Sequence, residues 1–197
     1  MEAGHLGAAL VNSRAADLDH ALAQLKMQPV VPVLANIVDS KGMVDSALVA
    51  QAEAWFKPSF ELARSIHSPG ESLAIPTWHY GHEPSTPFAT HIAKYFQNSI
   101  REDGLLAIAR QGIICMEGKA GTIQEIFQDS VHNYYQTFAQ FSPMILFGVD
   151  YWTNSYPVVG VLQKLFPAHF AKYVLVTDDV EAATKFIEKF SPEAHDN

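Results

Sequence analysis

Short apolar runs recur along the chain, each bounded by polar or turn-forming residues. They are too short for helices and are rich in Ile, Leu and Val, which is typical of buried strands. The runs predict strands at residues 72–78, 112–116, 144–148 and 173–177. We expect a further extended segment at residues 91–97.

Between these runs, apolar residues recur every three or four positions, which is the spacing of one helix face. Pro58 is expected to start a new turn or a kink within one of these segments, because proline donates no backbone hydrogen bond. Asp178 or Asp179 is expected to cap a last helix that runs to residue 190. The other predicted helices are at residues 8–24, 43–66, 101–110, 122–141 and 151–166.

Strands that alternate with helices indicate βα units, in which helices cover both faces of a parallel sheet. We therefore predict an α/β fold of three layers with a mainly parallel sheet. The strand at residues 112–116 is expected to be central, with Cys115 buried. Ligands of such sheets bind beyond the carboxyl ends of the strands, so a functional site is expected in the loops that follow them.

The segment after strand 112–116 is rich in small residues and leads into a helix. Gly118, Ala120 and Gly121 allow backbone N–H groups to approach a ligand, and Thr122 follows them. The first N–H groups of a helix have no partner within it and lie at the positive end of its dipole. This loop therefore predicts an anion site of the kind that binds phosphate. It matches neither the dinucleotide-binding fingerprint nor the Walker A pattern.

Two charged residues near this loop, Glu125 and Arg101, each have two interpretations. Thr122 and Glu125 have the spacing of a capping box, in which the carboxylate bonds the first amide of the helix. A carboxylate in the first turn would also face a bound phosphate. Arg101 opens a helix near a strand end, and is either a solvated arginine paired with Glu102 or Asp103 or a cation facing the same crevice as Glu125.

Composition and charge narrow the class of protein. Of 197 residues, 48% are hydrophobic and 17% charged, which excludes a disordered chain and indicates an additional buried face such as a subunit interface. The net charge of −8 makes nucleic acid a poor partner. No apolar run is long enough to span a membrane, and the first residues do not resemble a secretory signal. Since Cys115 is the only cysteine, we predict a cytoplasmic globular protein without an internal disulfide.

Arg101, the strand 112–116 and the loop after it resemble the LONELY GUY (LOG) family, nucleotide 5′-monophosphate nucleosidases once described as lysine decarboxylase-like. The family signature is an Arg followed about fifteen residues later by P-G-G-x-G-T-x-x-E, and Met116 stands at the position of its proline. Glu117 makes the loop one residue longer than in the family. Residues 1–8 resemble the end of the family's first Gly-rich motif, so we expect an N-terminally shortened domain.

The resemblance implies a single Rossmann-like nucleotide-binding domain over residues 1–197, with a helical insertion at residues 29–69. It also implies hydrolysis of the N-glycosidic bond of nucleoside 5′-monophosphates to a free base and ribose 5-phosphate. The family is oligomeric and needs no cofactor or metal for this reaction, so we expect a homodimer or larger homo-oligomer without either. The alternative is a non-catalytic nucleotide-binding or sensing module, or an inactive truncated homologue.

Family roles carry over to matching residues of this sequence. Glu125 would bond the ribose hydroxyls and stabilise an oxocarbenium-like charge, as carboxylates do in glycosidases. Arg101 would orient Glu125 and the substrate, or assist the departing base. The substrate phosphate would be bound by Gly118, Ala120, Gly121 and Thr122.

Several other residues are weaker candidates for the site. Asn98, Lys119 and Trp78 are candidates for substrate contact, and packing within the core or a loop is the alternative for Trp78. His79 and His82 are spaced for shared metal ligation, but no third ligand is evident, so hydrogen-bonding histidines and no metal site are expected.

Overall fold

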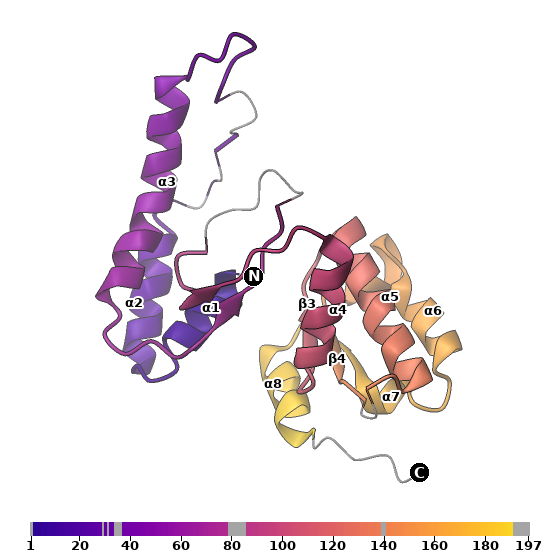
Figure 1. The fold of residues 1–197 in the computed structure, drawn as a ribbon. Coiled ribbons are helices and arrows are strands. Elements are labelled where there is room, and N and C mark those ends of the chain that lie inside the picture. The colour runs from indigo at the N-terminus through magenta and orange to yellow at the C-terminus, as the bar shows by residue number, and fades with distance from the viewer. Residues whose placement is uncertain are drawn as a thin grey trace. The chain divides into compact units, whose positions relative to one another are not determined.

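The computed structural model describes residues 2–28, 30, 32–33, 37–78, 86–138 and 141–190. The chain divides into two compact units, Met1–Gln97 and Asn98–Asn197 (Figure 1). Both units contain helices and parallel strands, which confirms the predicted α/β class. The expectation of a single domain stays a prediction. Every helix in the described part of the chain is too short or too polar to cross a lipid bilayer.

The first unit combines helices with a pair of short parallel strands. Its core contains Leu6, Ala21, Leu62 and Phe88. The pairing of the two strands is extended by a bridge between Thr77 and Tyr95. The described elements are α1 (Glu2–Ala9), α2 (Ala15–Leu25), α3 (Ser46–Ser65), β1 (Leu73–Ala74) and β2 (His91–Ile92).

Two helix predictions in this unit differ from the structure. The helix expected at residues 8–24 is divided into α1 and α2, because the chain turns at residues 10–13. α2 starts after Arg14, whose backbone N–H donates to the carboxylate of Asp17 at 2.9 Å. Pro58 starts no new helix, because α3 runs through it, and the alternative of a kink stays a prediction. A proline removes one bond of the helical ladder, and the bonds of the neighbouring residues maintain this helix.

The second unit alternates helices and strands, as the sequence pattern predicts. The helix expected to end at residue 141 ends earlier, where Gln136 adopts the left-handed conformation. Asp179 caps the last helix, because its carboxylate accepts hydrogen bonds from the backbone N–H groups of Glu181 and Ala182. The elements are α4 (Asn98–Ile108), β3 (Ile113–Cys115), α5 (Ala120–Tyr135), β4 (Met144–Phe147), the π-helix η1 (Tyr151–Ser155), α6 (Val158–Leu165), α7 (Phe170–Tyr173), β5 (Val174–Thr177) and α8 (Val180–Lys189).

The sheet of the second unit is parallel, in the order β3-β4-β5. Its central strand is β4, so the prediction that the strand at residues 112–116 is central is wrong for the described sheet. Ile114 of β3 is 57% exposed, whereas Ile145 of β4 is fully buried. Cys115 is buried, as predicted. A short apolar run suits an edge strand with one covered face as well as a central strand, so the run alone does not distinguish them.

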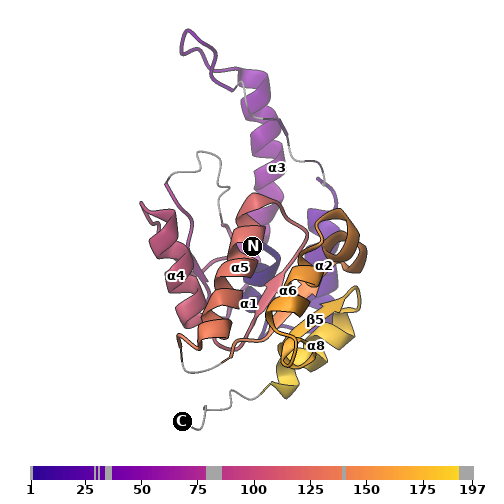
Figure 2. The same cartoon turned by 90° about the vertical axis from the view of Figure 1, so that its right-hand side faces the viewer.

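Helices cover both faces of this sheet, which gives the three predicted layers. On one face Cys115, Met144 and Leu146 pack with Ile126 of α5 and with residues of η1 and α6. α8 contacts β5, and its Ile187 lies close to the backbone just before β3. Figure 1 shows the strands between α8 on one side and α5 and α6 on the other. α4 packs beside α5 on the same side (Figure 2).

The loops at the carboxyl ends of the three strands are bonded to one another. The hydroxyl of Tyr151, after β4, donates to the carbonyl of Gly118, after β3, at 2.6 Å. The amide of Val149 donates to the carboxylate of Asp178, after β5, at 2.9 Å. These bonds hold the loop after β3, where the sequence predicts a site, against the loops of its neighbours.

Candidate functional site

The site is built around the start of α5, which follows β3 after a short loop. The helix begins at Ala120, and Lys119 occupies the N-cap position. Among the described residues no side chain accepts a hydrogen bond at this cap. The N–H groups of the first turn are thus left for a ligand, at the end of a helix of 16 residues whose dipole favours an anion there.

Gly118 and Gly121 have different structural roles in this loop. A Cβ atom on Gly118 would lie 2.1 Å from Oγ1 of Thr122 and 2.7 Å from its Cβ, so a side chain does not fit. A Cβ atom on Gly121 would meet no described atom within 4 Å. Although both glycines are predicted to make room for a ligand, Gly118 makes room for Thr122, and only Gly121 leaves the start of α5 open.

The capping-box interpretation of Glu125 is wrong. A capping box would need Thr122 at the N-cap, but the helix starts earlier and Thr122 lies inside its first turn. The carboxylate of Glu125 therefore does not cap the start of α5. It is half-buried, and its pKa is raised, first by burial and then by the negative charge of Glu102, while the guanidinium of Arg101 opposes this effect.

Arg101 is buried, contrary to the interpretation of a solvated surface arginine. Only 7% of the residue is exposed. Its Nη2 atom lies 3.5 Å from Oε1 of Glu102, which follows it on α4. Gln124, the neighbour of Glu125 on α5, bonds Glu102, the neighbour of Arg101 on α4, so the packing of these two helices brings the segments of both predicted residues together.

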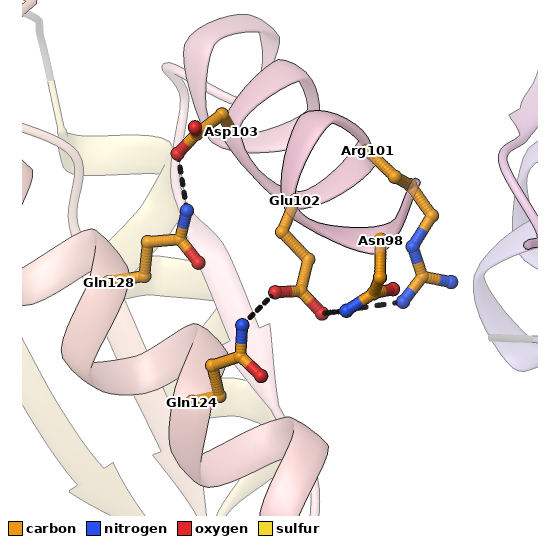
Figure 3. A network of polar contacts seen from close by, with 6 residues as sticks. All are labelled: Asn98, Arg101, Glu102, Asp103, Gln124 and Gln128. Atoms are coloured by element: carbon orange, nitrogen blue, oxygen red, sulfur yellow. Dashed lines mark hydrogen bonds and ion pairs between the residues drawn. The ribbon is translucent and has the colours of Figure 1, made fainter. Parts of the chain in front are cut away.

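Glu102, which the sequence names only as a possible partner of Arg101, is at the centre of a buried polar network (Figure 3). It is 2% exposed. Asn98 Nδ2 donates to its Oε1 at 2.5 Å, and Gln124 Nε2 of α5 donates to its Oε2. The available signal was the spacing of Asn98 and Glu102, four residues apart and hence on one helix face. An apolar pattern gives no indication that a carboxylate is buried.

The weaker candidates have different positions. Asn98 belongs to the Glu102 network, and its buried Oδ1 accepts no hydrogen bond from the described residues. Lys119 is exposed beside the start of α5. Trp78 belongs to the first unit, is 56% exposed and stacks on Phe96 at 5.9 Å, so it is not a core residue. His79 and His82 lie outside the described residues.

The additional residue of the loop, Glu117, is accommodated at the end of β4. Its side chain lies against Gly148, where a Cβ atom would come within 3.3 Å of Oε1. Gly148 has a φ of 115°, which a residue with a side chain rarely adopts. The carboxylate therefore lies beside a neighbouring strand end, which reduces the conflict between its charge and an anion at α5.

Cys115, the only cysteine of the sequence, lies in β3 next to the site and is buried. Burial raises the pKa of the Cys115 thiol to about 12, so the reactive thiolate is not formed near neutral pH. Within the described ranges, no three His, Cys, Asp or Glu side chains are grouped so that they could hold a metal ion.

No protein-family model matches this chain, and no curated protein shows significant sequence similarity to it. The resemblance to the LOG family rests on the residues of the signature themselves.

Proposed function

We propose that the second unit hydrolyses the N-glycosidic bond of nucleoside 5′-monophosphates, releasing a free base and ribose 5-phosphate. The observation that carries this proposal is one helix, α5, that offers an uncapped N-terminus and, in its second turn, the half-buried Glu125, whose neighbour Gln124 bonds the partner of Arg101, Glu102. A phosphate suits the first feature, and a sugar that develops positive charge suits the second. The LOG signature in the same residues supports the same reaction.

The spacing of these features along α5 suits a ribose 5-phosphate. With a rise of 1.5 Å per residue, the Cα of Glu125 lies about 6 Å along the helix from that of Gly121. Helical Cα–Cβ bonds tilt toward the N-terminus, so the Glu125 side chain leans toward the first turn. One sugar phosphate can therefore contact the N–H groups with its phosphate and Glu125 with its ring.

In the proposed reaction the bond between C1′ and the base nitrogen breaks, and its electron pair leaves with the base. The ionised carboxylate of Glu125 stabilises the positive charge that develops on the ribose. A water molecule then adds to C1′, and the proton that it loses goes to the base. Arg101 orients Glu125 and favours its ionised form against the effect of burial.

The test is a direct assay for the products. The purified full chain is incubated separately with AMP, GMP, IMP, CMP and UMP, and free base and ribose 5-phosphate are quantified by chromatography. We expect equal amounts of the two products from at least one nucleotide. An equal amount of the Arg101→Ala variant serves as the control and should release neither. Wild type that releases no base from any of them contradicts the proposal.

A nucleotide-binding module without catalysis is the second candidate. It is favoured by the two positions at which the loop departs from the LOG family signature: Met116 replaces the signature proline, and Glu117 is an additional residue. The uncapped start of α5 binds a phosphate whether or not the glycosidic bond is broken. Calorimetric titration that shows nucleotide binding, together with no base release after long incubation, would establish this candidate.

We further propose that the chain forms a homodimer or a larger homo-oligomer. An exposed apolar face on α5 supports this proposal. Val131, Tyr134 and Tyr135 are exposed, and their spacing places them on one side of the helix. All three residues lie within the helix that the sequence predicts at residues 122–141.

A further inference from the structure

We propose that Glu102 is a positioning residue of the same site: it fixes the guanidinium of Arg101 and connects it, through Gln124, to the helix that carries Glu125. This inference rests on the proposed hydrolysis of nucleoside monophosphates. It assigns to Glu102 a role that requires its negative charge, and not only its size and shape.

Both oxygens of the Glu102 carboxylate are held (Figure 3). Oε1 accepts from Asn98, one helical turn earlier, and lies 3.5 Å from Arg101 Nη2. Oε2 accepts from Gln124, the neighbour of Glu125 on α5. A carboxylate fixed at both ends allows little rotation, so the guanidinium that pairs with it is also restricted.

Burial of the charged Glu102 side chain costs free energy of folding. A carboxylate that is 2% exposed loses most of its hydration, and a buried ion pair is commonly no more stabilising than apolar residues of similar volume. The cost is increased by Glu125, a second carboxylate whose pKa the charge of Glu102 raises. Stability alone therefore does not account for a carboxylate at this position.

A neighbouring contact also joins the two helices. Asp103 accepts a hydrogen bond from Gln128 of α5, in the same manner as Glu102 from Gln124, and lies 3.5 Å from His132 Nε2. The side chain of Asp103 is 61% exposed, so this contact joins α4 to α5 without burying a charge. What distinguishes Glu102 is its pairing with Arg101 and its proximity to Glu125.

The decisive variant is Glu102→Gln, with Asp103→Asn as the matched control. Glutamine keeps the size of the side chain and can still accept from Asn98. Its amide can donate to Gln124 once the Gln124 amide flips, so the contact between the helices is kept. Each variant removes one negative charge from α4, but only Glu102→Gln removes the charge that pairs with Arg101.

With the nucleotide that the wild type hydrolyses best, we expect Glu102→Gln to lower kcat by about 10- to 100-fold, the scale of a misplaced catalytic group. KM should change little, because the phosphate still binds at the start of α5. Asp103→Asn should keep both values. A purely structural Glu102 would leave kcat unchanged in Glu102→Gln, and that result would overturn the inference while the proposed function stands.

A second measurement is independent of turnover. Nuclear magnetic resonance detects the Nε–H group of an arginine whose guanidinium is held rigidly, and the chain has only four arginines, so an Arg101→Lys variant assigns the signal. We expect a sharp Arg101 signal in the wild type and in Asp103→Asn, and its broadening or loss in Glu102→Gln. If the wild type releases no base, the proposed function fails and this signal alone decides: dependence on Glu102 supports the positioning, and an unchanged signal overturns it.

Discussion

Glu125 is the residue on which the proposed chemistry depends. In Glu125→Gln the amide keeps the shape of the side chain but lacks the charge that stabilises an oxocarbenium-like transition state. We expect base release to fall by about 10²-fold or more, the scale of removing one preorganised electrostatic contact. The melting temperature should not fall, because the substitution removes a half-buried charge and no cap. Full turnover together with a lower melting temperature would show that Glu125 is structural.

Asp129 is a buried carboxyl group on the inner part of α5, and it predicts a pH dependence of stability. Its side chain accepts from Nδ2 of Asn133 at 3.0 Å, but burial raises its pKa from 3.8 to about 7. A carboxyl group with a higher pKa in the folded than in the unfolded chain destabilises the fold where it is ionised. The cost is complete above about pH 7, decreases as the pH falls and is absent below the unfolded pKa.

Asp129→Asn should therefore stabilise the protein at pH 8 by on the order of a few kcal/mol, since asparagine can still accept the bond from Asn133. The advantage should shrink toward zero as the pH falls to about 4. Thermal unfolding followed by circular dichroism between pH 4 and 8 measures both effects. Asp19→Asn, at an exposed position, is the control and should show no such trend. A difference that stays constant with pH would contradict the assigned cause.

At the residue scale, the sequence was sufficient to identify Arg101 and Glu125 as candidate site residues, because their spacing around a strand matches the signature of a known family. It was not sufficient to find Glu102 or Gln124. Their role depends on which side chains meet when α4 packs beside α5, and this long-range contact has no periodicity in the sequence. The same limit explains why Arg101 could be interpreted as a surface residue.

At the scale of elements, the two glycines at the start of α5 are expected to differ in role. Gly118 is structural, and Gly121 leaves room for a ligand. Gly118→Ala should lower the melting temperature, because its Cβ would overlap Thr122, and overpacking of this kind costs about 1–3 kcal/mol. Gly121→Ala should keep or raise the melting temperature, because alanine is the better helix former and the space beside it is open. It should, however, weaken binding of ribose 5-phosphate in calorimetric titration, because the methyl group occupies the open side of the anion site.

This pair of variants gives a clear contrast between two neighbouring glycines. If Gly121→Ala binds ribose 5-phosphate as well as the wild type does, the phosphate does not lie at the start of α5. If Gly118→Ala melts at the wild-type temperature, the close approach of Thr122 is not a constraint on the fold.

The strands of the second unit were predicted closely from the sequence, because each is a compact apolar run between helices. The helix expected at residues 151–166 is divided into η1 and α6, and the sequence did not indicate α7. Boundaries that depend on local chemistry were predicted less well. Thr122 was a plausible N-cap by its spacing to Glu125, but the loop ends sooner and Lys119 takes that position. Asp179 was predicted as a cap and is one, because its carboxylate is within reach of the first free N–H groups.

At the scale of the whole molecule, the alternation of strands and helices predicts the α/β class but not which strands pair. β1 pairs with β2, whereas β3, β4 and β5 form a sheet of their own. The order of strands in a sheet is decided by contacts between distant segments, and similar apolar runs occupy the edge and the centre. The position of β3 at the edge of the described sheet could not be read from its composition for this reason.

Self-association is the prediction that belongs to this scale. Val131, Tyr134 and Tyr135 are 47%, 51% and 72% exposed on α5, and an exposed apolar face of this kind is typical of a subunit contact. Light scattering at micromolar concentration should give at least twice the mass of one chain.

Replacing Val131 and Tyr135 together by glutamate should reduce the mass to that of one chain, because burial of two unpaired carboxylates opposes association. As a control, Val11→Glu places one such charge at an exposed position of the first unit and should leave the mass unchanged. A wild type with the mass of one chain would contradict the prediction, and the exposed face of α5 would then be ordinary surface.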